Sequence, residues 1–354
     1  MKCACRIIKQ TDQQNYAERG CFTMIKVAFF DTKPYDKLYF EPYASSAGIT
    51  IKYFESKLAS SSAIMARGAD AVCAFVNDTV DADAIRVLHE NDVKLLALRC
   101  AGYNNVDLRA ARDVLTVVRV PQYSPHAVAE HAMALLLTLV RKTHRAYNRT
   151  REYNFNLNNL MGFDLHGKTI GVVGTGRIGC AFINLCRGFG MRVIAYDPHP
   201  KSDVPAEYVT FERLCGESDI ISLHCPLTKQ THHLICRESL GWMKQGVYLL
   251  NTSRGALIDA GDLLEAIRER RIGGAGLDVY EEETELFYED FSDTIISDEI
   301  ITGLLSMPNV LVTSHQAFLT KEALENIART TVQNITDFFA GKEPIHAVAL
   351  PKTQ

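Results

Sequence analysis

The stretch Gly171-Val-Val-Gly-Thr-Gly-Arg-Ile-Gly179 decides how the rest of this sequence is interpreted. An apolar run, Lys168-Thr-Ile170, comes before it, and the segment 180–186 after it has the apolar spacing of a helix. The helix is predicted to end at one of two glycines, at position 188 or 190. The order strand, glycine turn, helix is typical of a dinucleotide-binding βαβ unit.

Each glycine of this motif has a predicted physical role. Gly174 would allow a tight turn, Gly176 would let a pyrophosphate approach the backbone, and Gly179 would let the helix pack closely on the strand. The next predicted strand, 191–196, ends at Asp197. A carboxylate at that position accepts hydrogen bonds from the ribose hydroxyls and repels a 2′-phosphate, so the motif predicts NAD rather than NADP.

Composition limits the possible partners and compartments. The 354 residues, 47% of them hydrophobic, suit two globular domains, and the net charge of −4 without a basic tract argues against nucleic-acid binding. The ten cysteines are scattered without a CxxC pair, which favours a reduced, cytoplasmic protein over a disulfide scaffold. The apolar run 127–140 contains Glu130 and His131 and is too short for a bilayer, so we expect no membrane span.

The chain before and after the glycine motif predicts two α/β domains with parallel sheets. Residues 1–23 are expected to be an N-terminal extension, because the first convincing strand begins just after Met24. Strand-like runs then recur up to residue 120, at 27–30, 49–53, 71–76, 93–99 and 116–120. A Pro121–Pro125 break is predicted to be a hinge, followed by one long helix from about 126 to 151.

The second half is predicted to return the chain to the first domain. Strands there are expected to end near 197, 223, 250, 277 and 313, which would bring polar residues to one edge of a doubly wound sheet. A final amphipathic helix is predicted over about 321–340. We therefore predict a discontinuous domain of residues 24–122 and 322–354, with residues 123–321 forming the nucleotide-binding domain between its two parts.

Three ionisable residues stand at or just beyond predicted strand ends and could form a catalytic set. Arg254 carries a planar fork of donors suited to a carboxylate, and His315 can give or take a proton near neutral pH. An ion pair with Glu283 would favour the protonated ring. Taken singly, each has an ordinary structural interpretation: a solvated arginine, an acidic surface loop and a satisfied histidine. The pair His232-His233 has no acid or cysteine at ligand spacing, so no metal site is predicted.

From Met24 onward the sequence resembles the D-isomer-specific 2-hydroxyacid dehydrogenases. The matching motifs are GVVGTGRIG, LRCAGYNNVD, VRVPQYSPHAVAEHA, ISLHCPLT, NTSRGALID, GLDVYEEE and HQAFLT. The run 286–292 and the insertion after it resemble the branch of the family that acts on lactate. The resemblance implies two Rossmann or flavodoxin-like domains, NAD as cofactor, pyruvate and D-lactate as the substrate pair, and a homodimer.

The resemblance also implies roles for individual residues. The catalytic residues would be Arg254, Glu283 and His315. The cofactor would be bound by Gly174, Gly176, Arg177, Ile178, Gly179, Asp197, Cys225, Pro226, Thr252, Ser253 and Asp278. The substrate would be bound by Ala101, Gly102, Tyr123, Arg254 and Phe318, where Ala101-Gly102 replaces the family's commoner Val-Gly. Two alternatives stay open: a dehydrogenase of this family for a bulkier 2-oxo acid, and an NAD-responsive binding protein similar to the related transcriptional corepressors.

Overall fold

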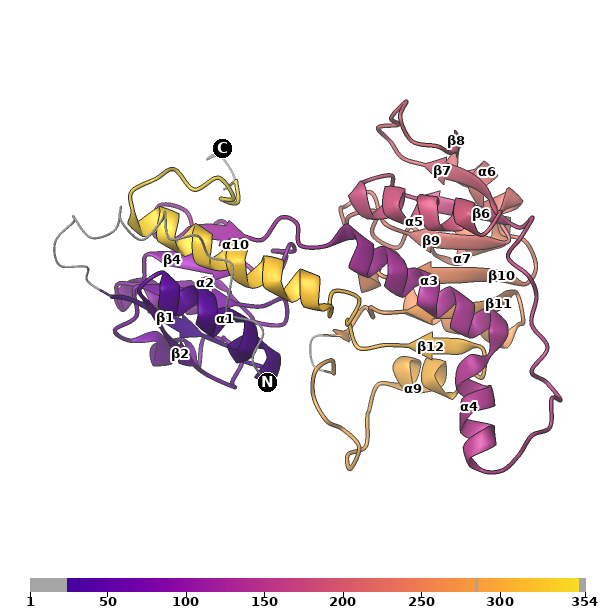
Figure 1. Cartoon of the computed structure of the whole chain (residues 1–354), viewed down its shortest axis with the longest axis horizontal. Coiled ribbons are helices and arrows are strands. Elements are labelled where there is room, and N and C mark those ends of the chain that lie inside the picture. Colours follow the sequence, from indigo (N-terminus) through magenta and orange to yellow (C-terminus); the bar gives the residue numbers. More distant parts are fainter. Residues whose placement is uncertain (1–23, 284–285, 350–354) are drawn as a thin grey trace, which may run out of the picture. The chain divides into compact units, whose positions relative to one another are not determined.

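The computed structural model describes residues 24–283 and 286–349, which form two compact units (Figure 1). One unit comprises the chain up to Pro121 together with the part from Glu325 onward, and the other comprises Gln122–Leu324. The predicted extension 1–23 lies outside the described residues. From the sequence, domain boundaries were predicted between residues 122 and 123 and between residues 321 and 322. The two units divide after Pro121 and after Leu324.

The first unit is built on a five-stranded parallel sheet with the order β2-β1-β3-β4-β5. Its strands are β1 (Ile25–Phe29), β2 (Ile49–Tyr53), β3 (Ala71–Ala74), β4 (Leu95–Leu98) and β5 (Thr116–Arg119). Its helical elements are α1 (Pro34–Ser46), η1 (Ala63–Ala66), α2 (Ala82–Glu90) and, from Glu325 onward, α10 (Lys321–Phe339). Helix α10 buries Ala323, Ile327 and Ile335, whose spacing gives the apolar stripe expected from the sequence.

The second unit contains a seven-stranded parallel sheet with the order β12-β11-β10-β9-β6-β7-β8. Its strands are β6 (Thr169–Val173), β7 (Arg192–Tyr196), β8 (Glu207–Tyr208), β9 (Ile220–Leu223), β10 (Val247–Asn251), β11 (Ile272–Leu277) and β12 (Val310–Val312). The chain builds outward from β6 to β8, then crosses back to β9 and builds outward on the other side. The strand order thus reverses between β6 and β9, and ligands of doubly wound sheets bind at the carboxyl edge of such a reversal.

Helices cover both faces of this second sheet (Figure 1). Helices α3 (Pro125–Arg141) and α5 (Arg177–Gly188) lie on one face, and α6 (Phe211–Glu217) and α8 (Ala260–Arg268) pack on the other. The remaining helical elements are α4 (Thr143–Arg151), α7 (Arg237–Trp242), η2 (Gly255–Leu257) and α9 (Glu299–Ser306). Neighbouring residues of one strand enter opposite cores: Leu250 packs beneath α3 and Leu249 packs toward α8. Burial on both faces explains why these strands are continuous apolar runs in the sequence.

Two local predictions differ from the structure, and one strand was not predicted. The predicted helix 126–151 is two helices, because Lys142 adopts a left-handed conformation (φ 52°) between α3 and α4. The returning chain occupies the end of α3: a Cβ added at Gly162 would lie 2.1 Å from the Val140 carbonyl oxygen. The strand before the glycine turn runs to Val173 rather than ending at Ile170, and the short edge strand β8 was not predicted.

Within residues 24–283 and 286–349, none of the helices has the length and hydropathy needed to cross a bilayer.

Candidate active site

The glycine turn after β6 has the geometry that a dinucleotide needs. Gly174 has a φ of 94°, and a Cβ at this position would lie 2.7 Å from the backbone of His224, which follows β9. A Cβ at Gly179 would lie 2.0 Å from the carbonyl oxygen of Gly174. Glycine is therefore required at both positions. A larger residue at 174 would clash with the chain after β9, and a larger residue at 179 would push α5 away from the turn after β6.

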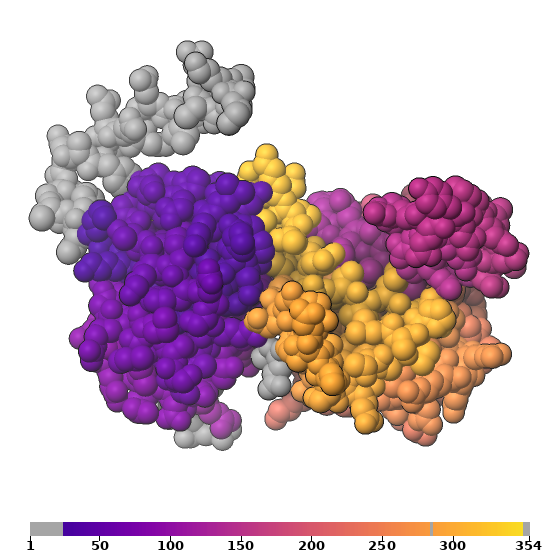
Figure 2. Space-filling view, turned by 90° about the horizontal axis from the view of Figure 1, so that it is seen from below, coloured from indigo at the N-terminus to yellow at the C-terminus, as the bar shows by residue number. Residues whose placement is uncertain are grey.

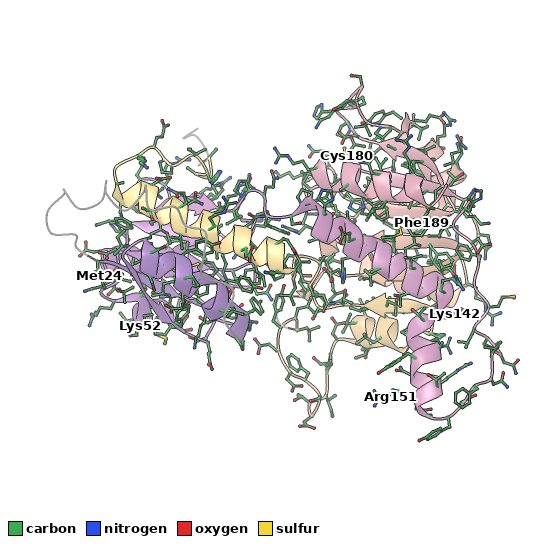
Figure 3. The ribbon with its side chains drawn as sticks, in the orientation of Figure 1. Met24, Lys52, Lys142, Arg151, Cys180 and Phe189 are labelled. Carbon is green, nitrogen blue, oxygen red and sulfur yellow. The ribbon has the colours of Figure 1, made fainter. Side chains whose placement is uncertain are left out.

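Gly176 has a different role, because a Cβ added there would meet no atom within 4 Å. It is the N-cap of α5 and has no side chain to bond the N–H groups of the first turn, to which Arg177 and Ile178 belong. These N–H groups and the positive end of the helix dipole form an anion site with open space in front of it. This is the place where the pyrophosphate of a dinucleotide fits. Figure 3 labels Cys180 and Phe189 at the two ends of this helix.

Asp197 is held at the end of β7 by hydrogen bonds to both carboxylate oxygens. The backbone N–H and the hydroxyl of Thr175 donate to Oδ2 at 2.8 and 2.9 Å, and the N–H of His199 donates to Oδ1 at 2.9 Å. Partial burial raises the pKa of Asp197, but the hydrogen bonds from Thr175 and His199 outweigh it, and the pKa lies below its ordinary value. The side chain is thus a fixed anion where the adenosine ribose would lie.

His224, which follows β9, is a buried residue at the same edge of the sheet. The His224 ring packs on the Phe182 ring with centroids 4.8 Å apart, and burial lowers the pKa of His224 to about 3. Nδ1 of His224 and Oγ1 of Thr252, which follows β10, are buried and have no hydrogen-bond partner among the described residues. At the ligand-binding edge of the sheet, a bound cofactor or water can complete such atoms.

Glu283 and His315 form a direct pair. Nδ1 of His315 lies 2.9 Å from Oε1 of Glu283, and the two side chains are 15% and 13% exposed. The Tyr280 N–H donates to the other carboxylate oxygen at 3.0 Å, which fixes the carboxylate plane. His315 itself has a φ of 49°, a strained conformation that the surrounding loop must hold.

Arg254 follows β10 at the same sheet edge, because Asn251, Leu277 and Val312 are register partners on neighbouring strands. The following residue, Gly255, packs directly on the chain that leads to Glu283: a Cβ there would lie 2.0 Å from the Tyr280 carbonyl carbon. The loops carrying Arg254 and Glu283 are therefore in contact. An arginine on a loop that contacts the loop of a histidine–glutamate pair suits a 2-oxo acid, since the guanidinium can bind a carboxylate and the imidazole can supply a proton.

Comparison with known proteins agrees with this chemistry. D-lactate dehydrogenase of Escherichia coli is 48% identical over 322 residues, which cover 90% of this chain and 98% of the relative. Residues 133–317 match the family described as D-isomer specific 2-hydroxyacid dehydrogenase, NAD binding domain. The chain belongs to the D-isomer specific 2-hydroxyacid dehydrogenase family.

Solved structures of this family support the fold and the cofactor. The pyruvate reductase of Chlamydomonas reinhardtii superposes with a TM-score of 0.86 at 43% identity, covering 91% of this chain and 98% of that one. The NAD complex of a dehydrogenase of this family from Lactobacillus delbrueckii ssp. bulgaricus has a TM-score of 0.74 at 30% identity, covering 92% and 100%. Like the family, this chain is an NAD-dependent oxidoreductase with two parallel-sheet α/β domains.

The remaining residues predicted from the family resemblance lie at several places. Cys225 is half-buried, Pro226 is exposed, and the Ser253 hydroxyl donates to the Leu223 carbonyl at 2.9 Å. Asp278 is fully buried, and its carboxylate accepts hydrogen bonds from Thr313, Gln316 and Ala317. These bonds fold the turn that carries His315, so Asp278 has a structural role in addition to its predicted contact with the nicotinamide.

The predicted substrate residues are divided between the two units. Ala101 and Gly102 follow β4 in the first unit, where Nη1 of Arg119 donates to the Ala101 carbonyl at 2.7 Å. In the second unit the Tyr123 and Phe318 rings meet edge to face with centroids 6.4 Å apart. Their roles toward a substrate stay predictions.

Sequence reasoning missed two residues that support the catalytic pair. The Tyr288 hydroxyl donates to the His315 carbonyl at 2.7 Å, and the Tyr288 ring stacks on the His315 ring. Nε2 of His131 lies 3.1 Å from the Thr313 hydroxyl and 3.2 Å from Oδ1 of Asp278. A signal existed for Tyr288, which lies in the run 286–292 that marked the lactate branch. For His131 the only signal was a polar residue in an otherwise apolar helix.

Proposed function

We propose that this chain is an NAD-dependent D-lactate dehydrogenase, which reduces pyruvate to D-lactate with NADH and catalyses the reverse reaction. The observation that carries the proposal is the 2.9 Å pair of His315 and Glu283 at the sheet edge that also bears Arg254 and the glycine turn. The pair supplies a held proton and the arginine supplies a carboxylate anchor, which together are what a 2-oxo acid requires.

Each residue of the set has one task in this proposal. Arg254 would bind the carboxylate of pyruvate through its planar fork of donors. Glu283 occupies Nδ1 of His315, so Nε2 is the nitrogen that would give its proton to the keto oxygen. NADH, when bound, supplies the hydride that reaches the carbonyl carbon. The positive charge of Arg254 would also stabilise the negative charge that develops on the oxygen.

The substrate contacts form part of the same proposal. The backbone at Ala101 and Gly102 would bind the substrate carboxylate, Tyr123 would lie near the reacting oxygen, and Phe318 would close the side-chain pocket. Phe318 is 7% exposed and meets the Tyr123 ring, so a large aromatic wall stands where a small methyl group is expected to bind. If Phe318 lines the side-chain pocket as proposed, its ring would restrict that pocket and favour pyruvate over bulkier 2-oxo acids.

We further propose a homodimer that works in the cytoplasm. Helix α4 and the segment after it project from the second unit (Figures 1 and 2), and Lys142 and Arg151 mark the two ends of the helix in Figure 3. Large apolar side chains are exposed along this part of the chain: Tyr147, Tyr153, Phe155, Leu157 and Met161. Several large exposed apolar side chains along one segment are typical of a subunit interface. The free thiols Cys73, Cys180, Cys186 and Cys215 suit a reducing compartment.

The test is to incubate the purified chain with pyruvate and NADH, follow the loss of NADH absorbance, and resolve the lactate by chiral chromatography. We expect D-lactate, and faster turnover of pyruvate than of phenylpyruvate or 2-oxoisocaproate. Formation of L-lactate would contradict the proposed stereochemistry. Preference for the bulky acids would indicate a dehydrogenase for other substrates, and NADH binding without turnover of any acid would indicate a cofactor-responsive binding protein.

A further inference from the structure

Two adjacent histidines and a distant glutamate meet on the second unit. The ligand atoms of His232, His233 and Glu281 all lie within 4.8 Å of one another. Nε2 of His233 is 2.6 Å from Oε1 of Glu281, and the two imidazole centroids are 4.0 Å apart. Elsewhere within residues 24–283 and 286–349, no other three histidine, cysteine or acidic side chains come together in this way. The sequence alone predicted no metal site at His232 and His233, because Glu281 lies far from both histidines along the chain.

The backbone explains why the two rings lie on one side of the chain. Consecutive side chains of an extended segment point to opposite faces. His233 instead has a φ of 50°, and its N–H donates to the Ala256 carbonyl at 2.9 Å, which anchors this turn beside η2. The turn therefore presents two imidazoles together toward Glu281.

A fourth residue orients the central imidazole. Oδ1 of Asp259 caps α8 by accepting the N–H of Asp262 at 2.9 Å, and its Oδ2 lies 3.4 Å from Nδ1 of His233. With the Nδ1 proton directed at Asp259, Nε2 is the ring nitrogen that can coordinate an ion next to Glu281. Metal-bound histidines are commonly held in this way, with the distal ring nitrogen donating to a carboxylate.

We propose that His232, His233 and Glu281 bind a divalent transition-metal ion of the Zn²⁺ class, with Asp259 as the positioning residue for His233. Two imidazoles and one carboxylate form a ligand set that suits Zn²⁺, and water completes a four-coordinate shell. The ion would replace the direct contact between Nε2 of His233 and Oε1 of Glu281. Metal–ligand bonds of about 2.0–2.2 Å place neighbouring ligand atoms roughly 3–3.5 Å apart, so that pair has to open by less than about 1 Å. Because His232 is exposed, the site can be reached from solvent.

A metal ion bound to this cluster would affect the loop that carries Glu283. Glu281 is two residues before Glu283, and Gly255 packs against the peptide that joins Tyr280 to Glu281. An ion bound here would tie this loop to the turn at His232 and His233, and would restrict the loop that carries Glu283. The site is therefore a place where metal availability can alter the enzyme without contact between the ion and the substrate.

The experiment measures Zn²⁺ binding by titration calorimetry on the full chain, stripped with EDTA and dialysed, without pyruvate or NADH. We expect one Zn²⁺ per chain in the wild type and at least about tenfold weaker binding in His232→Ala and in Glu281→Gln. His89→Ala, which removes an exposed histidine of α2, is the matched control and should bind Zn²⁺ like the wild type. Since His232 is exposed, its replacement is expected to leave the fold intact, and circular dichroism checks this.

Two further measurements make the result decisive. Co²⁺ should give the visible absorption bands of a four-coordinate site in the wild type and the His89 variant but not in the other two. Binding should weaken as the pH is lowered from about 7.5 to about 5.5, because protons compete for imidazole ligands. Two results would overturn the proposal. One is equal Zn²⁺ affinity in the wild type and both cluster variants, and the other is loss of Zn²⁺ binding in the His89 control variant as well. Neither result depends on the proposed dehydrogenase activity.

Discussion

Nδ1 of His315 lies 2.9 Å from Oε1 of Glu283, although one residue follows β11 and the other follows β12. Adjacent parallel strands place their carboxyl ends side by side, so two loops that are distant along the chain can share a proton. Asp278 and Tyr288 hold the His315 turn from two sides. The pair is thus built into the sheet edge and does not depend on a flexible surface loop.

His315→Gln should reduce turnover about 10²–10⁴-fold in both directions, because the variant cannot hold the transferred proton. NADH affinity, measured by fluorescence titration, should stay near the wild-type value, since no cofactor residue is altered. Turnover that survives the substitution would show that another group supplies the proton.

Glu283→Gln should lower turnover at least about tenfold, equivalent to about 1.4 kcal/mol of transition-state stabilisation, because the amide cannot stabilise a protonated ring as a carboxylate does. A double-mutant cycle measures whether this effect acts through the histidine. In a His315→Gln background the Glu283 substitution should have little further effect. Independent, additive losses would mean that Glu283 has a separate role.

Gly176→Ala and Gly179→Ala should have different consequences, although both add one methyl group. The first has open space and should lower the free energy of unfolding by at most about 1 kcal/mol while weakening NADH binding. The second places its Cβ 2.0 Å from the Gly174 carbonyl oxygen and should cost about 1–3 kcal/mol as well as cofactor affinity. Urea unfolding and NADH titration on both variants distinguish a loss of stability from a loss of cofactor affinity. Normal NADH affinity in Gly176→Ala would contradict the proposed pyrophosphate site.

Asp197→Ala should weaken NADH binding far more than NADPH binding, because it removes the ribose acceptor together with the charge that repels a 2′-phosphate. Kd values for both cofactors give the preference as a ratio, which we expect to fall at least about tenfold. Thr175→Ala is the control: it removes a hydroxyl that orients Asp197 but keeps the carboxylate. That variant should bind NADH more weakly and still reject NADPH.

Replacing both Phe155 and Met161 by serine should dissociate the proposed dimer, since each contributes a largely exposed apolar side chain next to α4. Analytical ultracentrifugation reports the change directly. Ile345→Ser, an equally exposed apolar position in the first unit, should leave the dimer intact. A wild-type chain that sediments as a monomer would refute the interface.

The alternating strands and helices of the fold could be predicted from the sequence. Strands buried on both faces appear as apolar runs, and the stretch from Gly171 to Gly179 carries its turn chemistry locally. The identity of the catalytic set came mainly from the family resemblance, because Glu283 alone is one acid in an acidic run. Its partners are set by strand register, which no local pattern encodes.

Other features could not be predicted because they depend on tertiary contacts. The break at Lys142 lies where Gly162 packs against the end of α3, and a continuous helical pattern gives no warning of it. The cluster of His232, His233 and Glu281 depends on where the turn beside η2 meets the chain after β11. Each case requires knowing which segments meet in space.

The contact between Gly255 and the Tyr280 carbonyl has a practical consequence for altering this enzyme. Any residue larger than glycine at position 255 would push apart the loops of Arg254, the proposed substrate anchor, and Glu283, the proposed partner of the proton donor. Libraries that aim to widen substrate range should therefore keep position 255 constant.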